Sequence, residues 1–277
     1  IDGVNILYTY DSFSRLYTVT DNRAGGVTTY TYDDNGNLDT MLYPNGIKHD
    51  WDYNRDNRLT DITVTKSSNV TVNSFNYSLG YAGNRTAVVE HSGRMINWTY
   101  DNLYRLTNET IIGVAESGTT TYTYDAVGNR QSRISTIGAI VNQDFTGNYT
   151  ANDWLTDGYA YNDNGATTTS PDGTYVYDAE NKLLSAVVNG DNISYIYDGD
   201  GNRVAKEVNG TVTRYLTDTL NPTGYSQTLK EKTSLGNVIT RYVYGNDLIS
   251  TTDISSGNTY CYGYDGQGSV RQMYDSV

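Results

Sequence analysis

The sequence is poor in the residues that most often carry cross-linking, catalysis or membrane insertion. Its 277 residues include one cysteine, three prolines, two histidines and three phenylalanines. A single cysteine excludes an internal disulfide framework and a cysteine-based metal cluster. No apolar run approaches the length of a membrane-spanning helix, which predicts that the chain has no membrane span.

Aliphatic and basic residues are scarce as well. Leu, Ile, Val and Phe together make up about one fifth of the chain, and the formal net charge is −13. An acidic chain argues against nucleic acid as a partner, since phosphate binding needs clustered Lys and Arg. The composition lies close to that of disordered chains, and it excludes a thick aliphatic core.

Tyrosine is abundant, with 28 copies, and its ring can be buried while its hydroxyl stays hydrated. Residues 195–204 show how it is used. Two tyrosines two residues apart lie on the same face of a β-strand. Asp198 can then accept hydrogen bonds from backbone N–H groups ahead of it, and Gly199, Gly201 and Asn202 tolerate the positive φ of a chain reversal. Alternating apolar and charged residues follow, so one motif predicts one β-hairpin.

The motif recurs about a dozen times, at first every 21 to 22 residues. The copies place their strand-ending tyrosine, aspartate, turn glycine and arginine at Tyr10, Asp11, Tyr32, Asp33, Gly36, Tyr53, Tyr100, Asp101, Tyr124, Asp125, Gly128, Arg130, Tyr177, Asp178, Tyr197, Asp198, Gly201, Arg203, Tyr264, Asp265 and Gly268. We interpret these as the residues that build the repeat. No hairpin of such an array can bury its faces alone, so neighbours must pair edge to edge. The sequence predicts an all-β fold with nearly no helix, in which tandem hairpins form a long antiparallel sheet that curls into a spiral or shell.

The pattern lapses between Ile134 and Asp157. We interpret this interval as a hairpin whose aromatic residues are displaced, with Phe145 and Tyr149 as candidates, and not as a linker, because its composition is not that of a disordered spacer.

The unit Tyr-x-Tyr-Asp-x-x-Gly-Asn-Arg resembles the YD repeat of the RHS family, whose relatives include the shell components of Tc toxins and the teneurins. The resemblance extends from Tyr8 to Asp275. Residues 214–218, 221–227, 242–250 and 264–271 also resemble the approach to the RHS-associated core. We therefore expect a YD-repeat array over residues 1–213 and the start of the core over residues 214–277, continuous with the same sheet.

The resemblance implies a hollow β-shell that encloses a toxic C-terminal segment, in a secreted or cell-surface bacterial protein. In that family the core can hold a self-cleaving aspartyl protease site, which together with the toxin would lie beyond Val277. The expectation is a non-enzymatic wall segment without cofactor. Its partner would be a cargo polypeptide or a neighbouring YD-repeat segment. The alternative is a cell-surface adhesion or carbohydrate-binding module that assembles through its edge strands. A third hypothesis is an enzyme with carboxylates gathered at the end of the sheet.

Three further features favour a structural reading. His49 and His91 lie in different repeats without ligands at metal spacing, so we interpret them as surface or strand-end residues. Residues 198–202 resemble the start of a calcium loop, but position 12 is Asn209, not Glu. Cys261 lies between two tyrosines in a strand pattern, which is typical of a packed thiol.

The aspartates of several turns are followed five residues later by arginine. The pairs Asp125 with Arg130 and Asp198 with Arg203 predict a ladder of cross-strand ion pairs that helps to fix the register. Each exposed pair would contribute only about 0.2–1 kcal/mol.

Overall fold

The computed structural model of the chain describes residues 5–23, 26–113, 116–221 and 223–275. Pro222, within the predicted core motif, lies outside them. None of the described residues is helical, and 25 strands form two antiparallel sheets. The prediction of an all-β array of tandem hairpins is confirmed. Across the described part of the chain no helix is long and apolar enough to cross a membrane.

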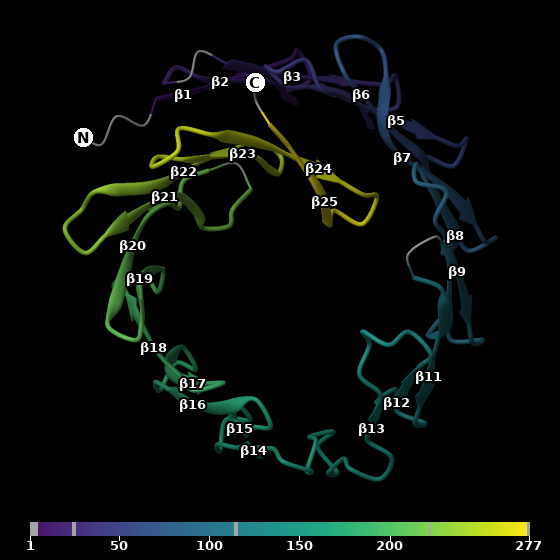
Figure 1. Cartoon of the computed structure of the whole chain (residues 1–277), viewed down its shortest axis with the longest axis vertical. Helices are drawn as coiled ribbons and strands as arrows, with labels where there is room; N and C mark the ends of the chain where they lie inside the picture. The colour runs from purple at the N-terminus through teal and green to yellow at the C-terminus, as the bar shows by residue number, and fades with distance from the viewer. Residues whose placement is uncertain (1–4, 24–25, 114–115, 222, 276–277) are drawn as a thin grey trace. The chain divides into compact units, whose positions relative to one another are not determined.

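The first sheet has 13 strands in sequence order, each hydrogen-bonded to the next. Their bounds are β1 Ile6–Tyr10, β2 Leu16–Asp21, β3 Gly26–Tyr32, β4 Leu38–Leu42, β5 Lys48–Tyr53, β6 Leu59–Thr65, β7 Thr71–Leu79, β8 Arg85–Glu90, β9 Met95–Tyr100, β10 Leu106–Ile112, β11 Gly118–Tyr124, β12 Arg130–Ser135 and β13 Gln143–Asp144. Figure 1 shows that this sheet curves continuously along its length, as expected of a twisted ribbon of many strands.

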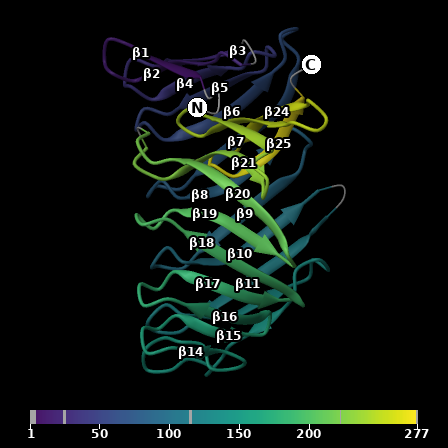
Figure 2. The ribbon, with the colours of Figure 1, turned by 90° about the vertical axis from the view of Figure 1, so that its left-hand side faces the viewer.

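The second sheet has 12 strands, again in sequence order. Their bounds are β14 Ala160–Tyr161, β15 Thr167–Ser170, β16 Gly173–Tyr177, β17 Leu183–Val188, β18 Asp191–Tyr197, β19 Arg203–Val208, β20 Thr211–Asp218, β21 Gln227–Thr233, β22 Val238–Tyr244, β23 Leu248–Asp253, β24 Thr259–Tyr264 and β25 Val270–Asp275. The green strands in Figure 2 lie side by side in this order. The ladder continues across residues 213 and 214 within β20. The predicted boundary between repeat array and core stays a prediction.

The expected single ribbon is interrupted between β13 and β14, and the chain divides into two compact units near the same place. The first unit holds residues 6–149 together with 262–275, and the second holds residues 150–261. At the interruption the flanking strands shrink to two residues each. Too few ladder hydrogen bonds remain there to carry one sheet into the next.

One five-residue turn closes most of the hairpins. In the turn at residues 11–15, the N–H of Asp11 donates to the carbonyl of Arg15 (2.9 Å) and the N–H of Ser14 donates back to Asp11 (3.1 Å). A type I turn followed by one left-handed residue and a bulge gives this pattern, and the register shifts at the bulge, between Thr9 and Tyr10.

The left-handed position is the fourth residue of the turn. Gly36, Gly128, Gly201 and Gly268 occupy it, with φ of 88°, 108°, 85° and 77°. Gly199, expected to share this conformation with Asn202, has φ outside the positive range, as does Asn202. A three-residue loop of this kind needs only one left-handed residue.

The core of the first unit is one layer of side chains on the tyrosine-bearing face. Across β3 to β7 a row of directly paired residues runs Tyr30, Met41, His49, Val64 and Asn73, all buried. In the second unit the buried residues include Ala186, Ala205, Val243, Ile249 and Cys261. Aromatic, small and polar side chains replace the thick aliphatic core that the composition excludes.

Candidate functional site

All eight predicted strand-ending tyrosines, namely Tyr10, Tyr32, Tyr53, Tyr100, Tyr124, Tyr177, Tyr197 and Tyr264, are the last residue of their strand. The predicted aspartates follow them as the first residue of the turn. The candidate site is therefore a set of turns along the sheet edge. We call the contacts between one turn and the next repeat the turn interlock.

The aspartate organises its own turn. One oxygen of Asp101 accepts hydrogen bonds from the backbone N–H groups of Leu103 and Arg105, both at 2.9 Å. The backbone N–H of Arg105, with its guanidinium, holds the pKa of Asp101 below its usual range. Asp198 accepts N–H bonds from Asp200 (3.0 Å) and Asn202 (2.8 Å), and the bond from Asn202 lowers the pKa of Asp198 in the same way. The charged form of the carboxyl is the one that fits the turn.

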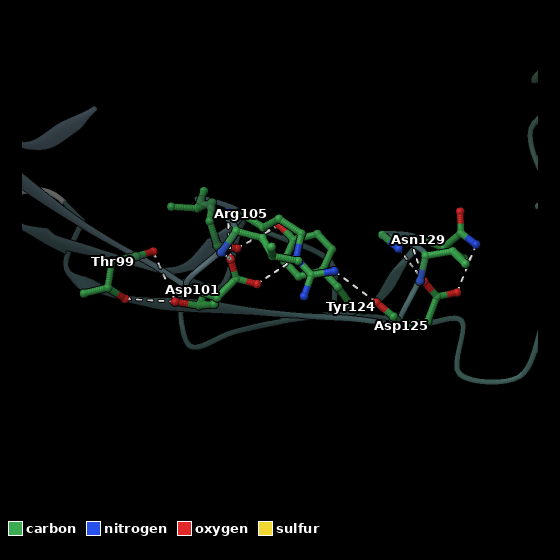
Figure 3. Close-up of polar contacts among 11 residues, drawn as sticks. Thr99, Asp101, Arg105, Tyr124, Asp125 and Asn129 are labelled. Carbon is green, nitrogen blue, oxygen red and sulfur yellow. Dashed lines mark hydrogen bonds and ion pairs between the residues drawn. The ribbon is translucent and has the colours of Figure 1, made fainter. Parts of the chain in front are cut away.

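The fifth residue of the turn reaches forward to the next repeat (Figure 3). Arg105 forms an ion pair with Asp101 (Nε to Oδ2, 2.7 Å) and donates to the backbone carbonyl of Asp125 (3.0 Å). Its guanidinium also lies 4.9 Å from the centre of the Tyr124 ring. Arg15 makes the same stacking contact with Tyr32, at 4.4 Å.

The tyrosine reaches back to the preceding repeat. The hydroxyl of Tyr124 donates to the carbonyl of Leu106, at 2.8 Å. The equivalent bonds run from Tyr32 to Leu16 (2.9 Å), Tyr100 to Arg85 (2.7 Å), Tyr149 to Arg130 (2.8 Å) and Tyr197 to Leu183 (3.0 Å). Each acceptor is the first residue of a returning strand. Tyr149 therefore occupies the tyrosine position in the interval where the motif lapses.

The predicted ladder of aspartate and arginine five residues apart is replaced by other contacts. Arg203 lies opposite Tyr197 and stacks on the rings of Tyr195 (5.7 Å) and Tyr215 (5.0 Å). Arg130 donates to the side chain of Gln143, at 2.8 Å. The bulge places the sixth residue on the tyrosine-bearing face, and the fifth is the one that turns back toward the carboxylate.

The last predicted turn, Asp265 with Gly268, belongs to a hairpin that is part of the first unit and packs on the first sheet. We call residues 262–275 the C-terminal hairpin. The N–H of Gly266 donates to the hydroxyl of Tyr77 (2.7 Å), and Arg85 donates to the Gly266 carbonyl. A Cβ at Gly266 would come within 2.8 Å of Leu59, so the close approach requires glycine.

Charge also holds the C-terminal hairpin. Arg271 forms ion pairs with Glu90 (2.6 Å) on β8 and with Asp265 (3.1 Å) in its own turn. Its guanidinium lies 5.3 Å from the centre of the Phe75 ring. Asn45 donates to the carbonyl of Asp275, at 2.8 Å. These partners, which are separated by up to 230 residues, were not predicted from the sequence.

The interpretation of His49 as a surface or strand-end residue was wrong, because its side chain is fully buried within β5. His91 is exposed, at the start of a turn. Cys261 is buried, and burial raises the pKa of its thiol to about 11, as befits a packed thiol. Among the residues that the structure describes, no group of three or more His, Cys, Asp or Glu could hold a metal ion.

The family is decided by the match to a known family model. The model of the teneurin YD-shell matches residues 81–277. The chain belongs to the teneurin YD-shell family. This confirms the resemblance based on the tyrosine and aspartate motif, and the YD-shell chain has the strands and turns just described.

Curated relatives and solved structures extend the comparison. The tRNA3(Ser)-specific nuclease WapA of Bacillus spizizenii is 29% identical over 280 residues, 97% of the YD-shell chain and 11% of the nuclease. The tRNA nuclease WapA of Bacillus subtilis is 29% identical over 279 residues, 98% of the chain and 11% of that protein. The chain thus spans about a tenth of the length of these relatives.

Among solved structures, the crystal structure of TcdB2-TccC3 has a TM-score of 0.72 at 17% identity, over 98% of the YD-shell chain and 18% of that chain. The Photorhabdus luminescens Tc holotoxin pore has a TM-score of 0.68 at 17% identity, over 98% and 17%. At this identity the likeness shows the fold alone, which the chain shares with these two structures.

Proposed function

We propose that the chain is a non-enzymatic wall segment of a YD-repeat shell that encloses a polypeptide cargo, in a secreted or cell-surface bacterial protein. The observation that carries the proposal is the likeness in fold to TcdB2-TccC3 over 98% of the chain. The relatives named as nucleases support it, because the matching region is only 11% of each. The activity in their names can then belong to the remainder of those proteins.

The turn interlock suits a wall. Five tyrosine hydroxyls bind a repeat to the preceding one, and Arg15 and Arg105 add a stacked guanidinium. Such contacts add up along a one-dimensional array, in which each repeat stabilises only its neighbours. A wall built in this way resists opening at any single repeat.

The tyrosine-bearing face suits a polypeptide cargo. Trp98 donates from its indole N–H to Glu109 (2.8 Å), and Tyr122 lies on the same face of the neighbouring strands. These side chains are half-buried and combine aromatic rings with polar groups. A surface of this kind can contact an unfolded chain without offering it a large apolar patch.

The test is protease protection in the full-length protein that contains these residues. We expect polypeptide outside the repeats to resist digestion in the native protein and to be cut rapidly when produced alone. The variant combining Arg105→Ala with Tyr124→Phe should shorten the protection. Tyr81→Phe, at a fully exposed tyrosine, is the matched control. If the segment is digested as fast in the native protein as when it is produced alone, enclosure is excluded.

An adhesive module is the second candidate, and the turn tips favour it. Tyr81, Leu103 and Val127 lie in the turns at residues 80–84, 101–105 and 125–129 of the first unit and are 106%, 71% and 75% exposed. Exposed apolar side chains in a row often mark interaction surfaces. Replacing all three by serine should abolish adhesion of the full-length protein to cells or glycan-coated surfaces, and should leave protease protection of a cargo unchanged.

A further inference from the structure

His49 is a titratable group that the proposed wall does not use. Its side chain is fully buried, and both ring nitrogens lack a hydrogen-bond partner. Three aromatic rings surround it. Tyr43 meets it edge-on at 5.5 Å, Trp51 stacks on it at 5.6 Å, and Tyr274 meets it edge-on at 6.1 Å between ring centres. A neutral imidazole fits this site, and an imidazolium would be left without solvation.

One wall of this site belongs to the C-terminal hairpin. Tyr274 lies on β25, and the other two rings come from β5 and from the turn that precedes it. The burial of His49 is therefore coupled to the docking of the hairpin on the first sheet. If the hairpin leaves, the imidazole faces water on that side.

Few charged groups face His49 from the elements packed against it. Its direct neighbours across the ladder are Met41 on β4 and Val64 on β6. The titratable side chains in ring contact are the hydroxyls of Tyr43 and Tyr274, which are neutral near neutral pH. Burial raises the pKa of Tyr274 to about 12.

The charged groups nearby already have partners. Lys48 and Asp50 alternate with His49 along β5 and form an ion pair with each other at 2.6 Å. On the hairpin, Arg271 is paired with Glu90 and Asp265. Among the described residues, no carboxylate offsets the effect of burial on the pKa of His49.

We propose that His49 makes the docking of the C-terminal hairpin acid-labile, so that the hairpin separates from the first sheet when the surroundings acidify. The proposal goes beyond the wall function and does not depend on a cargo. The hairpin holds the last described residues of the chain, so its release would loosen the attachment of any polypeptide that follows.

The sign of the effect follows from linkage. Burial lowers the pKa of His49 from 6.5 to about 4 in the docked state. At a pH above the ordinary pKa of 6.5, His49 is neutral in both the docked and the undocked state, and docking has its full strength. As the pH falls below 6.5, the undocked state takes up the proton first. The docking equilibrium then shifts toward release. The shift is about 30-fold at about pH 5, and it reaches about 300-fold when the pH is well below the lowered pKa of the docked state.

The test is hydrogen exchange in the peptide spanning residues 262–275 of the whole chain, corrected for the intrinsic pH dependence of exchange. Wild type should show an opening constant that rises about 30-fold between about pH 7.5 and pH 5. His49→Phe keeps a ring that cannot be protonated and should remove most of this rise. His91→Gln changes the only other histidine, an exposed one, and should behave as wild type.

Arg271→Met distinguishes the contribution of the ion pairs to docking from that of His49. It should weaken docking across the whole pH range and keep the rise on acidification. A wild-type opening constant that stays flat to about pH 5 overturns the proposal, as does an equal rise in His49→Phe.

If His49→Phe is undocked at neutral pH, His49→Leu replaces it. If both are undocked, the wild-type NMR titration decides. The ring contact between His49 and Tyr274 must disappear at the midpoint of His49 protonation, and separate midpoints overturn the proposal.

Discussion

The turns at residues 101–105 and 150–154 share a backbone and differ in their side chains. In both, the first N–H donates to the fifth carbonyl, at 3.0 Å from Asp101 and 2.8 Å from Thr150. The fourth residue is left-handed in each, with φ of 60° at Tyr104 and 61° at Asp153. The turn type is therefore set by the backbone and tolerates large changes in sequence.

The side chains that anchor the two turns are not equivalent. The Asp101 carboxylate accepts two N–H bonds at 2.9 Å, whereas the Thr150 hydroxyl accepts the corresponding bonds at 3.2 Å. At the fifth position Trp154 replaces arginine and stacks on Tyr161, with ring centres 4.9 Å apart. An aromatic pair thus takes the place of the stacked guanidinium.

The strands beside the two turns differ as well. β9 and β10, of six and seven residues, directly flank the turn at residues 101–105. The nearest strands before and after residues 150–154 are β13 and β14, which have two residues each and do not adjoin the turn. The weaker anchor coincides with the interruption between the two sheets. The comparison indicates that the backbone makes the turn, and that the charged and hydroxyl contacts of the interlock hold long strands in register around it.

The largest effect is expected from removing the whole tyrosine. Tyr124→Ala loses the hydrogen bond to Leu106 and the ring beneath Arg105, and should lower the free energy of unfolding by about 2–3 kcal/mol. Tyr161→Ala, beside the weaker turn, should cost about half as much. Urea denaturation of both variants measures the difference, and equal losses would contradict the ranking of the two turns.

Removing the hydroxyl alone gives a smaller effect. Tyr124→Phe leaves the Leu106 carbonyl without its donor and should cost about 1 kcal/mol. Tyr161→Phe keeps the stacking on Trp154 and should stay within about 0.3 kcal/mol of wild type. A cost at Tyr161 equal to that at Tyr124 would show that the hydroxyl bond is not what distinguishes them.

The weaker turn can be rebuilt toward the repeat motif. Thr150→Asp supplies a charged acceptor for the N–H groups of Asn152 and Trp154, and should stabilise the chain by about 0.5 kcal/mol. Thr150→Ala is the matched control and should cost about 1 kcal/mol. Thermal unfolding of the two variants tests the idea, which a loss of stability in Thr150→Asp would refute.

The smallest effect is local and depends on pH. Because the pKa of Asp101 is lowered in the folded state, its contribution is present above the ordinary value of 3.8 and is lost as the pH falls through the lowered one. The amides of Leu103 and Arg105 should then lose hydrogen-exchange protection. The amides of Asn152 and Trp154, bonded to a hydroxyl, should show no such step, and NMR at single residues can compare all four.

Much of the fold follows from local sequence, because each hairpin is encoded within about ten residues. The alternation of tyrosines gave the strands, and the aspartate and glycine gave the turns. Tyr149 was named as a displaced aromatic residue, and its hydroxyl bond to Arg130 agrees with that interpretation. The turn that begins at Thr150 was not placed, although a hydroxyl residue after Tyr149 and Asp153 at the left-handed position were a readable signal. The strand lengths on either side depend on neighbouring repeats, so the interruption was not predictable.

The rest of the candidate site depends on which parts of the sheet become covered. The alternation of side chains along β5 places His49 and Trp51 on one face, but it does not predict that Tyr274 packs against that face. The pairing of Arg271 with Glu90 joins residues 181 positions apart. No local pattern carries that information.

The backward reach of the tyrosines has a consequence for synthesis on the ribosome. The hydroxyl bonds of the interlock join residues 14 to 19 positions apart, always from a later tyrosine to the first residue of an earlier strand. Each repeat can close on its predecessor as soon as its own strand emerges, and contacts of such short range form quickly. The sheet can therefore grow from the N-terminus at the pace of translation, with each finished repeat serving as the template for the next.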